Sequence, residues 1–297
     1  MSDTSLSQAA SSITRRPLTT GLVALTPLLR PCYNRLIMPD KRNVNIPRIE
    51  IVGITGLPEI ENGAELGPMI VTAAIGQDTS LENGDILAVT QKVISKAEGR
   101  IVDLRTVTPS ERGLKLSIET ERDPRLVELI LRESKSIIKI DSERGIIIAE
   151  TRHGFICANA GIDQSNVAGE HMVSLLPEDP DGSARRIREE VAQILGVRVA
   201  VIISDTFGRA WREGQVNFAI GVSGIDPILD YRGSLDKQGS VLKTTSIAIA
   251  DELVAAGEMV MGKAEGIPVA LIRGYRYQPS AGGVAYLLRD PASDLFR

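Results

Sequence analysis

The stretch Val199-Ala-Val-Ile-Ile-Ser-Asp-Thr-Phe-Gly-Arg209 begins with a continuous apolar run rich in β-branched residues, the pattern of a strand that is buried on both faces. The run ends in Asp205, Thr206 and Arg209. A carboxylate at the tip of a rigid strand suits a hard cation, and a guanidinium suits phosphate or carboxylate. A plain turn that closes a strand has the same composition, so a site here requires other residues to converge on this stretch.

The composition is that of a globular protein with few aromatic residues. The 297 residues are 43% hydrophobic, 24% charged and only 3% aromatic, so the core must be aliphatic. Scarce aromatic residues argue against stacking on nucleic-acid bases, and a net charge of −4 gives no general attraction to polyanions. No apolar run approaches the roughly 20 residues that span a bilayer. We therefore expect a cytoplasmic protein without nucleic-acid or membrane partners.

Cysteine and histidine are too rare to build a metal cluster. Cys32 and Cys157 are the only cysteines, which indicates a reducing compartment rather than a disulfide framework. His153 and His171 are the only histidines. If a metal is bound, its ligands should therefore be oxygens.

Residues 1–45 differ in composition from residues 46–297. They are rich in Ser, Thr and Pro and carry six basic residues against two acidic ones. A transit-like peptide has this composition, and a secretory signal fits less well because no clean cleavage site follows the apolar patch. The composition favours a leader that forms no packed core, or translation that begins near Met38. We expect the catalytic domain to occupy residues 46–297.

The remaining pattern alternates irregularly and does not give the βαβ series of a Rossmann domain. Ser183 is expected to cap the helix that Gly196 ends. Besides the strand that opens at 199, the pattern predicts strands over 48–54, 85–90, 137–140, 145–150, 215–223 and 267–272, and helices over 66–75, most of 108–136, 184–195 and 246–261.

Two polar stretches follow predicted strands. Residues 91–100 place lysines, a carboxylate and an arginine around Gly99, which suits a phosphate pocket, although an ordinary solvated loop has the same residues. The stretch is not a P-loop, because its glycine spacing is wrong. Residues 157–166 are small and polar, with no room for a core, and contain Asp163 and Asn166. An Asx-turn pair would explain these two residues equally well.

Asp163 and Asp205 are distant in sequence, and each lies beside a short turn that contains glycine. Oxygen ligands of this kind suit Mg²⁺ or Mn²⁺ that bridges nucleotide phosphates. The basic residues available to balance the phosphate charge are Lys96, Arg209, Arg212 and Lys263.

Six short motifs carry a resemblance to a known family. They are Ser95-Lys-Ala-Glu-Gly-Arg100, Asn159-Ala-Gly-Ile-Asp163 with Ser165-Asn166, Asp179-Pro-Asp-Gly-Ser183, Ser204-Asp-Thr with Gly208-Arg209, Ala219-Ile-Gly-Val-Ser-Gly224 and Met261-Gly-Lys263. In this order they resemble the γ-glutamyl ligases of the deazaflavin coenzyme, factor 420, over about residues 47–290. Six motifs in register are far more specific than any one of them.

The resemblance implies a GTP-dependent ligase that adds L-glutamate to the lactyl-phospho-deazaflavin precursor, F420-0, through an acyl phosphate. It implies Mg²⁺ or Mn²⁺ in two sites, with K⁺ as an additional candidate ion. Asp163 and Asp205 would hold one metal and Thr206 would help to hold the second. Asp163, Asp205, Arg209 and Arg212 would serve catalysis. The implied nucleotide contacts are Leu57, Pro58, Glu59, Ile60, Gln91, Lys92, Lys96, Asn166, Met261, Gly262, Lys263 and Gly266.

The family fold implied is α+β, with an irregular mixed sheet in an intertwined homodimer. Glu59 stands where relatives more often have an apolar residue, and Gln91-Lys92 where a Ser-Thr pair can occur. The chain is expected to lack the second, nitroreductase-like domain of some relatives. Two other classes stay open: a metal- and nucleotide-dependent phosphatase, which would need no amine pocket, and a non-catalytic GTP-binding module.

Overall fold

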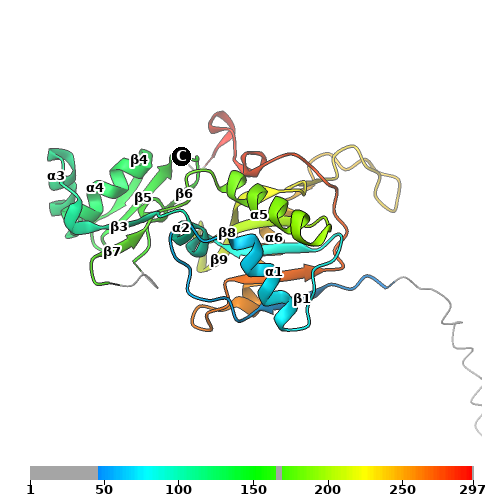
Figure 1. The fold of residues 1–297 in the computed structure, drawn as a ribbon. Helices are drawn as coiled ribbons and strands as arrows, with labels where there is room; N and C mark the ends of the chain where they lie inside the picture. The colour runs from blue at the N-terminus through cyan, green and yellow to red at the C-terminus, as the bar shows by residue number, and fades with distance from the viewer. Residues whose placement is uncertain (1–45, 165–168, 296–297) are drawn as a thin grey trace, which may run out of the picture. The chain divides into compact units, whose positions relative to one another are not determined.

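A five-stranded mixed sheet carries the larger of two hydrophobic cores in the computed structural model, which describes residues 46–164 and 169–295 (Figure 1). The chain divides into Met1–Ile46 and Pro47–Arg297, and the elements below belong to the second unit. The strands of the sheet, in spatial order, are β1 (Glu50–Ile54), β12 (Val269–Arg273), β2 (Ile86–Thr90), β8 (Ala200–Arg209) and β9 (Arg212–Ser223). Only β2 and β8 are parallel neighbours; the other pairs are antiparallel.

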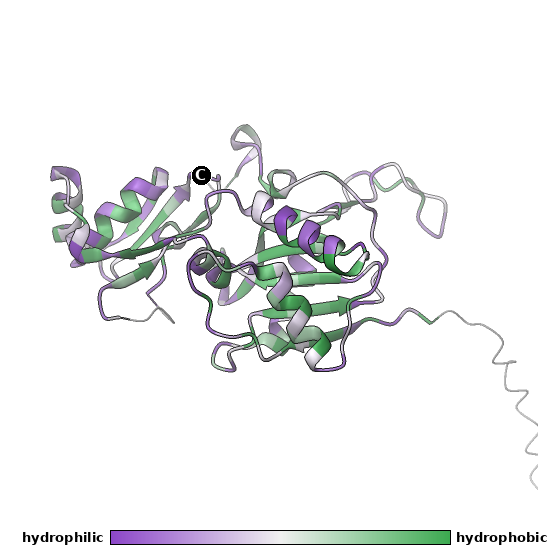
Figure 2. Ribbon diagram, in the orientation of Figure 1, coloured by the Kyte–Doolittle hydropathy of each residue, from purple (hydrophilic) through white to green (hydrophobic). Residues whose placement is uncertain are grey.

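Helices pack on both faces of this sheet. In Figure 1, α1 (Leu66–Gly76) and α5 (Pro180–Leu195) lie in front of the strands, and α6 (Ile249–Met261) lies behind them. Glycines at two contact points allow α5 and α6 to approach the sheet closely. A Cβ on Gly221 would lie 2.5 Å from the Pro180 carbonyl oxygen, and one on Gly257 would lie 3.3 Å from Ala270. Figure 2 shows the hydrophobic residues concentrated on the strands and on the helix sides that face them.

A second, smaller core forms around helices α3 (Glu111–Thr120) and α4 (Pro124–Glu133) and the three-stranded sheet β4-β5-β6. Those strands are Ser134–Asp141, Ile146–Thr151 and Ile156–Ala158. Strands β3 (Ile101–Asp103) and β7 (Met172–Ser174) pair beside it. The remaining elements are α2 (Gln91–Ala97), β10 (Leu229–Asp230), β11 (Ser246–Ile247) and the 3₁₀ turns η1 (Leu104–Thr106), η2 (Asn159–Gly161), η3 (Val284–Leu287) and η4 (Pro291–Ser293).

This arrangement is a mixed α+β fold, as expected, and each predicted strand and helix has a counterpart. Several boundaries were wrong. Strand β8 does not end at Asp205 but continues to Arg209, because β9 pairs with it along that whole length. Residues 246–247 form a strand before α6 begins at Ile249. Ser183 does not cap α5; the helix begins at Pro180, and the Asp179 carboxylate accepts a hydrogen bond from the Gly182 N–H at 2.9 Å.

Both polar stretches are more ordered than the sequence suggested. Residues 91–97 form helix α2 rather than a loop, and Gly99 ends it with a positive φ of 66°. The stretch after residue 157 does contribute to the core, because Cys157, Ala160 and Ile162 are all less than a tenth exposed. Ala160 and Ile162 belong to the smaller core. Residues 1–45, the predicted leader, lie outside the described residues.

Candidate active site

Asp205 lies within the paired part of strand β8. Its carboxylate accepts a hydrogen bond from the Thr206 N–H at 2.8 Å. Removal from water raises the pKa of Asp205 to about 7; the Asp163 charge adds to this, while the Thr206 N–H, Lys92 and Lys263 oppose it. The carboxyl therefore carries a proton for part of the time near neutral pH, and a nearby cation would favour its ionised form.

Asp163 is brought to the same place by an irregular bridge to strand β7. Its N–H donates to the Ser174 carbonyl at 3.1 Å, and the Ser174 N–H donates back at 2.8 Å. The Asp163 carboxylate forms an ion pair with the Lys92 ammonium at 2.8 Å. Lys92 lies in the first turn of α2, directly after strand β2. The structure thus assembles three of the predicted site residues, Asp163, Asp205 and Lys92, from three separate segments.

The two aspartates fit a divalent cation of the kind that keeps several waters. Mg²⁺ is commonly held by one or two carboxylates together with substrate phosphates. Two neighbouring carboxylates repel each other, and the raised pKa of Asp205 reports that repulsion together with burial. Within 46–164 and 169–295, no group of three or more His, Cys, Asp or Glu side chains could hold a metal. Asn166, predicted to contact the nucleotide, lies outside the described residues.

Thr206 enters a different polar network. Successive side chains of a strand point to opposite faces, so the Thr206 hydroxyl faces α6. It donates to Asn217 Oδ1 at 2.7 Å and accepts from Lys263 Nζ at 2.5 Å. Glu258 of α6 accepts from Asn217 Nδ2 at 2.8 Å and pairs with Lys263 at 3.1 Å. Sequence reasoning missed Asn217 and Glu258, although a polar residue inside an apolar strand was a signal for the first.

Lys96 and Gln91 both lie on helix α2. The Lys96 ammonium lies 2.5 Å from Glu59 Oε1, so the segment around residue 59 approaches α2. Gln91 is 1% exposed, and its Oε1 accepts from the Ser95 hydroxyl at 2.7 Å. Its Nε2 is buried without a hydrogen-bond partner in the part of the chain that the structure describes. An unused buried donor is costly, so this amide is suited to meet a bound group.

The remaining predicted nucleotide contacts fall into buried and exposed sets. Ile60 and Met261 are core residues, 6% and 0% exposed, so only their backbone groups can meet a ligand. Gly262 and Gly266 have positive φ angles of 60° and 69°, which glycine adopts without strain. Leu57 is half-buried and Pro58 exposed in the segment that leads to Glu59.

Arg209 and Arg212 lie in the turn of the β8–β9 hairpin, where they pair in register. The Arg209 guanidinium donates to the backbone carbonyls of Glu213 at 2.7 Å and Gly214 at 3.5 Å. Arg212 is exposed. Arg209 stands four residues beyond Asp205, roughly 13 Å along an extended strand. The Arg209 side chain is therefore engaged by the backbone of its own hairpin.

Cys157 lies close enough to Asp205 to feel its charge but is not suited to nucleophilic catalysis. Burial, with a smaller effect from Asp205, raises the pKa of the Cys157 thiol to about 12. The thiolate is the reactive form of cysteine, and it is not populated here at neutral pH. The chemistry that this site favours is charge neutralisation and alignment rather than covalent catalysis.

Comparison with known proteins gives a consistent result. The sequence matches the family described as F420-0:γ-glutamyl ligase over residues 55–274. It is 45% identical over 252 residues to the coenzyme F420:L-glutamate ligase of Methanothermobacter thermautotrophicus, covering 84% of this chain and 99% of that protein. The protein of the same name from Methanocaldococcus jannaschii is 42% identical, with 84% of this chain and 97% of that protein covered. That from Methanopyrus kandleri is 41% identical over 85% of this chain and 99% of its own length.

Proposed function

This chain belongs to the F420-0:γ-glutamyl ligase family, and we propose that it is an amide-forming ligase that joins L-glutamate to F420-0 at the expense of GTP. The observation that carries the proposal is the convergence of Asp163, Asp205 and Lys92 from three segments. A pair of carboxylates beside a lysine is suited to a nucleotide phosphate chain and its cation.

The proposed reaction has two steps. The carboxylate of the precursor attacks the γ-phosphorus of GTP, which forms an acyl phosphate and releases GDP. The amine of L-glutamate then attacks the acyl carbon, the amide bond forms, the C–O bond to phosphate breaks, and the amine loses a proton. A divalent cation held by Asp163 and Asp205 would neutralise phosphate charge and align the γ-phosphoryl group.

The protein side chains have separate tasks in this scheme. Lys96 and Lys92 would contact phosphate oxygens through charge-assisted hydrogen bonds. The buried Gln91 amide supplies a donor that the described residues leave unused. Thr206 and Lys263, held by Asn217 and Glu258, would approach the nucleotide from the α6 side. No protein nucleophile is required, in keeping with the protonated thiol of Cys157.

One assay tests the proposed function. The protein is incubated with GTP, Mn²⁺, L-glutamate and the deazaflavin precursor, and the products are measured by mass spectrometry. We expect one glutamyl residue added per GDP and phosphate released, and little phosphate when the precursor is omitted. Rapid GTP hydrolysis without the precursor would indicate a phosphatase instead. Tight GTP binding with no product, unchanged by loss of Asp205, would indicate a binding module.

We further propose that the chain acts as a homodimer with two divalent-cation sites, and with K⁺ as an additional candidate ion. Light scattering at the assay concentration tests the first point. Calorimetric titration of the metal-free protein with Mn²⁺, with GTP present, tests whether there are two divalent-cation sites. A monomer with full activity, or a single Mn²⁺ per chain with GTP present, would contradict the respective proposal.

A further inference from the structure

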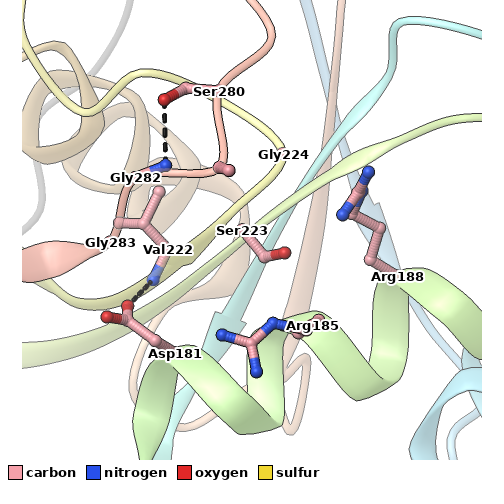
Figure 3. Close-up of a pocket in the computed structure, with 10 residues that line it drawn as sticks. Asp181, Arg185, Arg188, Val222, Ser223, Gly224, Ser280, Gly282 and Gly283 are labelled. Atoms are coloured by element: carbon pink, nitrogen blue, oxygen red, sulfur yellow. Dashed lines mark hydrogen bonds between the residues drawn. The ribbon is translucent and has the colours of Figure 1, made fainter.

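A cavity of about 150 Å³ lies beside the start of strand β8, away from the aspartate pair. Its walls come from α5, from the end of β9 and from the C-terminal loop 280–283 (Figure 3). Ser223 in this wall pairs with Val201, four residues before Asp205 on β8. The cavity is therefore separated from Asp205 by roughly 13 Å of extended strand.

Two arginines of α5 provide the charge of this cavity. Arg185 and Arg188 are three residues apart, so both side chains project from the same side of the helix. Within the described ranges, neither guanidinium has a carboxylate at ion-pair distance or a hydrogen-bond partner. Figure 3 shows Arg188 rising from α5 and Arg185 extending along the helix toward Asp181, with the Ser223 hydroxyl drawn between the two side chains. Ser223 is only 7% exposed, so its hydroxyl is a mostly buried donor beside two cations.

Asp181 also lines the cavity, and its carboxylate accepts hydrogen bonds from two backbone N–H groups. Its Oδ1 accepts from the Val222 N–H at 2.6 Å and from the Val284 N–H at 3.1 Å. These bonds tie the end of β9 to the C-terminal loop and so fix two walls of the cavity. The two arginines outnumber this one carboxylate, so the cavity lining carries a net positive charge.

Gly224, directly after strand β9, lets the backbone run close to Arg188. Its φ is 86°, and a Cβ there would lie 2.9 Å from Arg188 Nε. The backbone at Gly224 therefore runs close to the Arg188 side chain. The planar guanidinium fork is pre-organised for an oxyanion, so little side-chain entropy is lost for each hydrogen bond that it forms.

We propose that this cavity binds an oxyanion, either a phosphate or a carboxylate group, through Arg185, Arg188 and Ser223. Guanidinium groups form paired hydrogen bonds with both anions. The volume is below the roughly 300–1,000 Å³ of pockets that hold drug-sized ligands, so the cavity suits one anionic group rather than a whole nucleotide. Two sources supply this chemistry in the proposed reaction, free phosphate and L-glutamate.

The test measures binding without nucleotide or metal, so that it does not depend on ligase activity. The full chain, stripped of metal and then dialysed free of chelator, is titrated with inorganic phosphate or with L-glutamate at constant ionic strength, and binding is followed by calorimetry. Arg185→Met with Arg188→Met should weaken binding of one of the two anions by at least about tenfold. Arg186→Met is the matched control: it removes a cation of the same helix that pairs with Glu98 instead, and should leave the affinity unchanged.

The outcome also identifies the source. Loss of phosphate binding alone assigns the site to phosphate, and loss of glutamate binding alone assigns it to a carboxylate. Ser223→Ala, which is a smaller change to the fold, should weaken the same anion by a smaller factor. Unchanged binding of both anions in the double variant would overturn the proposal. So would a double variant that changes only the oligomeric state, because the arginines would then belong to a contact between copies.

Discussion

Two half-buried or buried carboxylates, Asp205 and Glu128, respond to their surroundings in opposite ways. Burial raises the pKa of Asp205 to about 7, because one N–H and two more distant lysines do not offset desolvation and the charge of Asp163. Burial acts on Glu128 in the same direction, but bonds from Ser110 and Arg132 outweigh it and lower the pKa. The fold therefore disfavours the ionised form of Asp205, which a bound cation would restore, whereas hydrogen bonds stabilise the ionised form of Glu128.

Asp205→Asn and Asp163→Asn should each lower turnover at least about a hundredfold, the scale of lost charge stabilisation at a transition state. The amide keeps size and hydrogen bonding but is a poor ligand for a hard cation. The melting temperature of Asp205→Asn should be unchanged or higher, because desolvation disfavours the Asp205 charge, whereas Asp163→Asn also loses the ion pair with Lys92. Asp78→Asn, at an exposed position with positive φ that Asn tolerates, is the control. Near-normal activity of either site variant at ordinary Mn²⁺ concentration would refute its metal role.

Lys96→Met should raise the KM for GTP at least about tenfold and leave the KM for L-glutamate nearly unchanged. A charge-assisted hydrogen bond to phosphate contributes roughly 1.5–3 kcal/mol. Methionine keeps the aliphatic stem of Lys96, whose side chain is 21% exposed. Lys115→Met removes an exposed charge on α3 and should change neither constant. Steady-state kinetics with each substrate varied in turn measures this, and a rise in the glutamate KM alone would place Lys96 in the acceptor pocket.

At the scale of elements, Glu128 joins α3 to α4. Its carboxylate accepts from the Ser110 N–H at 2.8 Å, from the Ser110 hydroxyl at 2.6 Å and from Arg132 Nε at 2.9 Å. Ser110 is the residue that caps α3. One side chain of α4 therefore holds the start of α3, and the charge of that side chain matters to both helices.

Glu128→Gln should lower the free energy of unfolding at pH 7 by about 1.5–3 kcal/mol. Since the folded pKa lies below the ordinary value of 4.5, the unfolded chain binds more protons between these two values. The stability that the carboxylate contributes is thus full above pH 4.5 and is lost as the pH falls further. Urea unfolding from pH 7 to pH 3 should show the difference shrinking. Glu111→Gln, exposed on α3, should show a small difference throughout, and an equal loss in both variants would refute the assignment.

The elements were largely predictable because their apolar periodicity is strong. Strands such as 85–90 and 267–272 are continuous aliphatic runs, which few other structures explain. Helix α2 was taken for a loop because its seven residues are too short for periodicity to show, and charge dominates them. The start of α5 was missed because Asp179 and Ser183 both have capping side chains. Pro180, favourable in a first turn, was the deciding signal.

The site was predictable in part. Asp163, Asp205 and Lys92 carry chemistry that a sequence displays, and the structure brings them together. Asn217 and Glu258 were missed because their role depends on which faces of β9 and α6 meet. Arg185 and Arg188 have the pattern of an ordinary solvated helix face, and only the fold places the end of β9 and the C-terminal loop beside them.

At the scale of the whole molecule, both cores and every described helix and strand lie within Pro47–Arg297. No helix in the described ranges is long and apolar enough to cross a membrane. A chain that starts at Asn43 should fold and turn over substrate as well as the full chain, because the sequence of residues 1–45 lacks the apolar periodicity of a segment that packs in a core. Thermal unfolding and the ligase assay check this. A large drop in melting temperature would show that the removed residues contribute to a core.

Strand β9 is the last strand of the large sheet, so one of its sides has no neighbouring strand among the described residues. The Ala219 N–H on it is bonded at 2.9 Å by the Asp251 carboxylate of α6, and the Val222 N–H by Asp181 of α5. Two helices on opposite faces thus each extend an acidic side chain around the sheet margin. An open margin is a template for uncontrolled addition of further strands, and the two carboxylates occupy it with negative charge. Acidic side chains on an edge strand are one of the features by which proteins limit such addition, and here they come from helices rather than from the strand itself.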